Sequence, residues 1–365
     1  MANPQPRSHS ACPFIAGPRI EDPARFVGRR DELRLLASRM TGAQPTSVNV
    51  VGDRRIGKSS LLYHFCQTYG ERVNDRDRYA VVYLDLQSED CTTEAKFYRA
   101  TMAALRSHRL ARARPELAQL VSPAVLDRDS FATAIRAWEQ RGVLPVICLD
   151  RFERLLKHLQ EFNDGFYNRL RALMDGSDLM LIVASRRNLD DYAKEYGLTS
   201  PFFNVGQRLE IEELEPEAVT QLVRVSDEQG QPSLHAREQA LAKAWGGRHP
   251  FLLQLAALKL WDATQMGKDE AWAKREFDRE VSRVKSRRVG LRRWQRRLRW
   301  LLVVPLVGQV VRWIGGVQDD VGNAVAGVLA LAAVAVGIVF VVTKPASFPE
   351  VMEQVKAWVT GTAEE

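Results

Sequence analysis

The chain has 365 residues, of which 45% are hydrophobic and 27% charged, and its formal net charge is +7 at pH 7. This composition is typical of a globular protein of more than one domain, and the four widely separated cysteines exclude a zinc ribbon or a disulfide framework. The excess charge is local, because residues 274–299 hold twelve Lys and Arg against three acids.

Residues 1–25 are rich in proline, and we expect them to wrap the surface as an N-terminal extension. From residue 26 to residue 212, apolar runs rich in β-branched residues alternate with helical patterns, which predicts an α/β core with a parallel sheet covered by helices. The predicted strands are 47–51, 79–86, 145–150, 179–185 and a shorter one near 208–211.

Residues 213–265 are predicted to be wholly helical and to form a small lid subdomain. Its predicted helices are 215–223, 236–245 and 251–261, with Gly246-Gly247 as the break between the last two. Beyond the lid we expect a basic helical stalk, membrane segments and a tail, over residues 266–299, 300–343 and 344–365.

A phosphate-binding loop follows the first predicted strand. Residues 52–59 read G-D-R-R-I-G-K-S and match the pattern G-x-x-x-x-G-K-[ST] between a strand and a helix. The ligand predicted from this pattern is a nucleoside triphosphate with Mg²⁺. Lys58 is expected to reach the β- and γ-phosphates, and the Ser59 hydroxyl to bind Mg²⁺. The predicted nucleotide-binding residues here are Gly52, Asp53, Arg54, Arg55, Ile56, Gly57, Lys58, Ser59 and Ser60.

Two acids follow the strand 145–150. Asp150 ends the run V-I-C-L-D, which is the position of a Walker B acid, and we expect it to hold Mg²⁺ together with Ser59. Glu153 has two interpretations: a surface acid at a helix N-terminus, or a catalytic group that contacts magnesium or orients water.

Three other segments are candidates for the same site. Arg186 follows the strand 179–185 and could sense the γ-phosphate, or be a surface arginine. His249-Pro250 could bring the lid over the phosphates, or only break a helix. Val27, Gly28 and Arg29 could pack near the adenine, or form an entry turn.

Six segments in this order resemble a known family. The chain is similar to the STAND-type P-loop ATPases related to the AAA+ ATPases, over roughly residues 12–262. The segments that carry the resemblance are 26–33, 50–62, 148–155, 181–187, 200–204 and 247–254.

The resemblance implies a nucleotide switch. Such proteins rest with ADP clamped between core and lid, and exchange for ATP moves the lid and drives oligomerisation. It also implies the roles given above for Lys58, Ser59, Asp150 and Arg186, and a nucleotide contact for His249-Pro250. One position departs from the family, because Arg151 stands where an acid usually follows the Walker B aspartate. We therefore expect slow hydrolysis, or a water oriented by Glu153.

A membrane segment is predicted near the C-terminus. Residues 321–342 are 22 residues without a charge, enough to cross a bilayer core of about 30 Å as a helix. Residues 300–317 are also apolar and either form a second span in a hairpin or lie along the interface. By the positive-inside rule, the basic run 274–299 would place the ATPase on the cytoplasmic side of the cell membrane, near anionic lipids.

Small residues with helical spacing within 321–342 suggest self-association, and we expect a homo-oligomer. These residues are Gly322, Ala326, Ala330, Ala333 and Gly337.

Three classes of function remain open. The first is a membrane switch whose output is triggered by an unknown protein, with a bacterial defence effector as its extension by analogy. The second is a membrane-anchored motor or chaperone. The third is a membrane-tethered DNA-binding ATPase, although the adjacent membrane segment already accounts for the basic run, so we do not expect nucleic acid as a partner.

Overall fold

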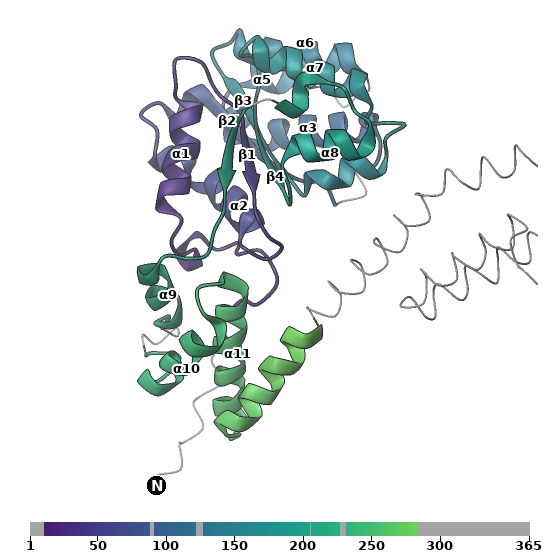
Figure 1. Cartoon of the computed structure of the whole chain (residues 1–365). Coiled ribbons are helices and arrows are strands. Elements are labelled where there is room, and N and C mark those ends of the chain that lie inside the picture. The colour runs from purple at the N-terminus through teal and green to yellow at the C-terminus, as the bar shows by residue number, and fades with distance from the viewer. Residues whose placement is uncertain (1–10, 88–90, 122–126, 205, 227–230, 284–365) are drawn as a thin grey trace, which may run out of the picture. The chain divides into compact units, whose positions relative to one another are not determined.

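The computed structural model describes residues 11–87, 91–121, 127–204, 206–226 and 231–283. Within these residues the core contains a five-stranded parallel sheet in the order β2-β3-β4-β1-β5 (Figure 1). The strands are β1 (Val48–Val51), β2 (Tyr79–Asp85), β3 (Leu144–Asp150), β4 (Met180–Ser185) and β5 (Gln207–Glu210). Each lies within one residue of its predicted ends, which confirms the α/β prediction.

The sheet is buried on both faces, as its apolar strands predict. All residues of β3 and β4 are buried, whereas the edge strand β5 alternates between half-buried and exposed residues. Neighbouring residues of a strand enter opposite layers, so Val81 and Val82 belong to different apolar clusters.

Helices form a layer on each face of the sheet (Figure 1). One layer contains α1 and α2, and the other contains α3 to α8 with a cluster of aromatic rings at its centre. The helices of the core are α1 (Arg30–Met40), α2 (Lys58–Thr68), α3 (Glu94–Ser107), α4 (Arg109–Ala113), α5 (Pro115–Leu120), α6 (Arg128–Glu139), α7 (Asp164–Asp175) and α8 (Leu189–Tyr196).

The predicted lid is helical. It contains α9 (Pro216–Val223), α10 (Ala236–Gly246) and α11 (Pro250–Gln265). The break at Gly246-Gly247 is present, and a Cβ on Gly246 would lie 2.4 Å from the Leu253 backbone, so only glycine allows this close packing of α10 on α11.

The first part of the predicted stalk packs on the lid. Residues 270–283 are helical, and within them Ala273 and Phe277 are buried. The ring of Phe277 lies 5.9 Å from that of Trp245 in α10. The compact unit that contains core and lid therefore extends to Ser282, beyond residue 265.

Several predictions concern residues that the structure does not describe. The remainder of the stalk (284–299), the membrane segments (300–343) with their small-residue stripe, and the tail (344–365) all lie outside the described residues. Among the residues that are described, no helix combines the length and apolar character needed to cross a membrane.

Candidate nucleotide site

The phosphate loop joins the end of β1 to the start of α2. Gly57 has φ of +105°, a conformation that glycine adopts without strain, and it directly precedes the first turn of α2. No side chain caps this turn, so its N–H groups are available to an anion. A Cβ on Gly52 would lie 2.9 Å from the carbonyl oxygen of Ile211, so the loop also packs closely against the segment after β5.

Lys58 lies folded back on the loop. Its ammonium group donates to the carbonyl oxygens of Gly52 at 2.6 Å and Asp53 at 2.8 Å. Burial lowers the pKa of Lys58 to about 8, although Glu153 and Asp150 act to raise it. A phosphate beside this amine would favour its charged form.

The strand order brings three predicted residues, Asp150, Glu153 and Arg186, to the end of the sheet where the phosphate loop lies. Because β4 lies between β1 and β3, Arg186 after β4 stands between the loop and the residues that follow β3. Arg186 Nε contacts Glu153 Oε1 at 2.9 Å. The other carboxylate oxygen of Glu153 is buried and has no hydrogen-bond partner among the described residues. Glu153 is thus a half-buried, ion-paired acid beside the phosphate loop.

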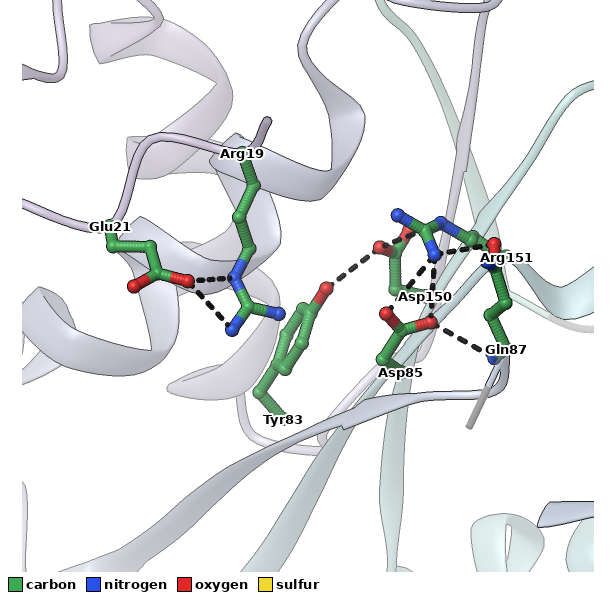
Figure 2. A network of polar contacts seen from close by, with 7 residues as sticks. All are labelled: Arg19, Glu21, Tyr83, Asp85, Gln87, Asp150 and Arg151. Atoms are coloured by element: carbon green, nitrogen blue, oxygen red, sulfur yellow. Dashed lines mark hydrogen bonds and ion pairs between the residues drawn. The ribbon is translucent and has the colours of Figure 1, made fainter. Parts of the chain in front are cut away.

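Asp150 is buried at the end of β3, with 1% of its surface exposed. Its Oδ2 accepts a hydrogen bond of 2.7 Å from the Tyr83 hydroxyl of β2, and Arg151 Nε lies 3.9 Å from the same oxygen (Figure 2). Burial, and secondly the charge of Asp150, raises the pKa of Tyr83, so the hydroxyl remains a donor.

Arg151, the departure from the family pattern, points along the strand ends toward β2 (Figure 2). Its guanidinium group contacts Asp85 Oδ2 at 3.1 Å and Gln87 Oε1 at 2.6 Å. Its backbone has φ of +60°, in the left-handed region. Arg151 therefore neutralises the charge of Asp85, whereas the family usually has an acid at this position.

A pocket of about 350 Å³ lies beside the loop, within the volume range of small-molecule and cofactor sites. Residues 54–60 line it together with the N-terminal segment, the residues after β3 and α11. One acid, Glu153, lines it, so the field in the pocket favours a polyphosphate. Its nine cationic lining residues are Arg19, Arg25, Arg29, Arg54, Arg55, Lys58, Arg151, Arg154 and Arg186.

The N-terminal segment, residues 11–25, forms one wall of this pocket, and most of its residues are exposed or half-buried. Its Ile15 N–H donates to Gln254 Oε1 of α11 at 3.0 Å, and its Ile20 N–H donates to Ser60 Oγ of α2 at 3.0 Å. Phe14 is buried, with 4% exposed, which explains why this segment packs inward. Ser60 thus contacts the N-terminal segment.

Residues 27–29 contact different parts of the molecule. Val27 lines the pocket, whereas Gly28 lies against the lid, where a Cβ would come within 2.8 Å of Ala218 in α9. The Arg29 guanidinium donates to the carbonyl oxygen of Ile56 at 3.1 Å and to that of Glu212. Arg29 therefore joins the phosphate loop to the segment between core and lid.

The lid contacts the site through the start of α11. Pro250 and Phe251 line the pocket, and the guanidinium carbon of Arg55 lies 4.1 Å from the centre of the Phe251 ring. His249 caps α11 and lines a second, more open cavity of about 640 Å³, together with Gly52 and Asp53. Arg186 lines both cavities.

The side chains present suit Mg²⁺ held through phosphate oxygens. The Ser59 hydroxyl lines the pocket, and the carboxylate of Asp150 is buried at the end of β3 and lines neither cavity. Magnesium typically takes one or two such protein ligands plus phosphates and water. No group of three or more His, Cys, Asp or Glu in the described part of the chain could hold a metal by itself.

Sequence reasoning missed four residues of this site: Arg19, Tyr83, Asp85 and Gln254. The partners of Ile15 and Tyr83 lie 239 and 67 residues away, so no local pattern marks them. The one available signal is that Tyr83 and Asp85 stand near the carboxyl end of a predicted strand.

Comparisons with known proteins agree with this arrangement. Residues 19–280 match a family model described as Novel STAND NTPase 1. The fold is similar to that of the Walker-type ATPase PABY2304 of Pyrococcus abyssi, with a TM-score of 0.55 and 17% identity, covering 86% of this chain and 91% of that one. It is also similar to the ORC2 protein of Aeropyrum pernix in its ADPNP–ADP complexes, with a TM-score of 0.50 and 14% identity, covering 70% and 69%. No curated protein matches the sequence.

Proposed function

Because the chain belongs to the Novel STAND NTPase 1 family, we propose that it is a slow ATPase switch that holds ADP at rest between its core and its lid. One observation carries this proposal. The cationic pocket is lined jointly by the phosphate loop, the N-terminal segment and α11, so a bound nucleotide would contact all three at once. Exchange of ADP for ATP then changes how the three fit together.

We assign roles to the predicted residues on this basis. Lys58 and the uncapped first turn of α2 would bind the phosphates, and Ser59 and Asp150 would hold Mg²⁺. Bound Mg²⁺ neutralises charge on the phosphates. Arg186 turns to the γ-phosphate, which separates it from Glu153. Glu153 is then free to orient the attacking water.

The ion pairs of two acids near the site, Asp85 and Glu153, support slow hydrolysis of ATP. Glu153, the acid assigned to orient water, is paired with Arg186, and Asp85 at the neighbouring strand end is engaged by Arg151. Release of Glu153 depends on competition for Arg186, which adds a step before hydrolysis. A switch benefits from this delay, whereas a motor does not.

The test uses the full chain, purified without added nucleotide and with detergent present. After denaturation we expect about one ADP per chain, and the intact protein should turn over ATP well below the rate of about 1 s⁻¹ at the low end of working enzymes. Lys58→Ala should carry no nucleotide. An empty wild-type site with brisk, Lys58-dependent turnover would contradict the switch and favour the motor or chaperone.

We further propose that residues 300–343 anchor the chain in the cell membrane, with the ATPase on the cytoplasmic side. The support comes from the sequence alone: an uncharged run over 321–342 and a basic run over 274–299. Carbonate extraction and protease protection test the anchor, and a fully extractable chain would overturn it. If induced expression of the full chain and of Lys58→Ala affect growth and membrane potential equally, a defence output is excluded.

A further inference from the structure

We propose that Tyr83 is a positioning residue for the magnesium ligand Asp150, and that Arg19 of the N-terminal segment holds Tyr83 in place (Figure 2). This inference rests on the proposed nucleotide site and extends it to two residues outside every motif of the sequence. It makes the N-terminal segment part of the magnesium site.

The first step is the bond between Tyr83 and Asp150. The carboxylate of Asp150 is buried, and the Tyr83 hydroxyl donates to its Oδ2 at 2.7 Å. Arg151 Nε lies 3.9 Å from that oxygen, and its guanidinium group is engaged by Asp85 and Gln87. A buried carboxylate requires hydrogen-bond donors, so the hydroxyl fixes how this carboxylate is turned.

The second step is the support of the Tyr83 ring. The guanidinium carbon of Arg19 lies 5.0 Å from the centre of this ring and 4.3 Å from that of Tyr63. Tyr63 meets Tyr83 edge-on, with the ring centres 5.3 Å apart. A cation over one ring and an edge contact from another limit how far Tyr83 can turn.

The third step links Arg19, through the N-terminal segment, to both the core and the lid. The next residue, Ile20, is bonded to Ser60 of α2, and Arg19 forms an ion pair of 3.1 Å with Glu21. The same segment is bonded to Gln254 of α11 through Ile15. Displacement of the segment from α2 would remove Arg19 from Tyr83, and Asp150 would then lose its fixed orientation. Magnesium binding therefore depends on the position of the N-terminal segment.

The test compares full-length variants by their affinity for a fluorescent, non-hydrolysable ATP analogue, in Mg²⁺ and in EDTA. The ratio of the two affinities measures the contribution of magnesium. Tyr83→Phe, which removes one hydroxyl, should lower this ratio about tenfold and leave the affinity in EDTA unchanged, as expected for a hydrogen bond to a charged group. Arg19→Ala should lower it about two- to fivefold.

Tyr98→Phe is the matched control. It removes a hydroxyl that donates to another carboxylate, Glu94, at 2.8 Å on the far side of the core, so the ratio should not change. If Tyr83→Phe fails to fold, Arg19→Ala carries the test because it leaves the sheet intact.

The outcomes separate the two proposals. Wild-type protein that binds the analogue with a magnesium effect, while both Tyr83→Phe and Arg19→Ala keep the wild-type ratio, overturns this inference and leaves the nucleotide site standing. Wild-type protein that does not bind the analogue overturns the proposed function itself.

Discussion

The two walls of the nucleotide pocket are built differently. The loop wall, residues 52–60, continues from a buried strand of the sheet, and Val50 just before it has no exposed surface. The opposite wall, residues 11–25 with the start of α11, is attached by bonds such as Ile15–Gln254 and by the Arg55–Phe251 contact. Single hydrogen bonds and cation–π contacts each contribute about 1 kcal/mol, so this wall can be released while the sheet stays folded.

This difference explains how one site can bind and also switch. A wall that belongs to the sheet gives affinity for phosphates in every state. A wall attached by a few long-range contacts changes position at low cost when the ligand changes. The predictions that follow perturb the loop wall first, because the largest effects are expected there.

Removing the loop lysine should cost the most affinity. Lys58→Ala deletes the ammonium group that would contact the phosphates, and hydrogen bonds of this kind to charged groups correspond to a loss of about 100-fold in affinity. Isothermal titration with ADP measures the loss. Lys194→Ala, which removes an exposed lysine of α8 paired with Asp190, is the control. A loss below tenfold in Lys58→Ala would show that the loop wall does not dominate binding.

The same lysine should make binding depend on pH. Burial lowers the pKa of Lys58 to about 8 in the free protein, and phosphate binding requires the charged form of this amine. Affinity is therefore full below pH 8 and should fall by up to about tenfold per pH unit as the pH rises above it. Titrations between pH 7 and 9.5 measure this slope, and Lys58→Ala should give a flat profile. A flat profile in the wild type contradicts the assignment.

Loosening the opposite wall should speed the release of ADP more than it weakens the binding of the phosphates by the loop. Gln254→Ala removes the acceptor of the Ile15 N–H, and the loss of one neutral hydrogen bond should speed ADP release about three- to tenfold. Stopped-flow chase of a fluorescent ADP measures the rate. Gln221→Ala, on the exposed side of α9, provides the comparison and should release ADP at the wild-type rate. Equal rates in both variants would mean that the segment does not retain the nucleotide.

The smallest effect is expected from the contact between lid and loop. Phe251→Leu keeps an apolar side chain at the start of α11 but removes the ring over which Arg55 lies. The loss of one cation–π contact should speed ADP release about two- to threefold in the same assay. An unchanged rate would limit the attachment of this wall to the N-terminal segment.

Sequence reasoning predicted the loop wall better than the opposite wall. The strands and the loop follow from local patterns, namely apolar runs and glycine spacing, and Asp150 follows from its place at a strand end. The ion pair between Glu153 and Arg186 could not be predicted, because it depends on β4 lying between β1 and β3. No local sequence pattern determines the order of strands in a sheet.

The contacts of the N-terminal segment did not follow from the sequence for a related reason. Its composition is that of an exposed, proline-rich extension, yet Phe14 is buried and Ile15 contacts a residue 239 positions away. The local sequence marks Tyr83 only as part of a strand. Its hydroxyl matters because parallel pairing sets Asp85 beside Asp150 and places both strand ends together.

The most direct test of the two-wall account is hydrogen exchange of the full chain with and without ADP. The account predicts that ADP slows exchange in residues 12–25 and 248–255 by at least several-fold, while the amides of β1 exchange slowly in both states. Equal exchange of residues 12–25 with and without ADP would contradict it, because the opposite wall would then be indifferent to the nucleotide.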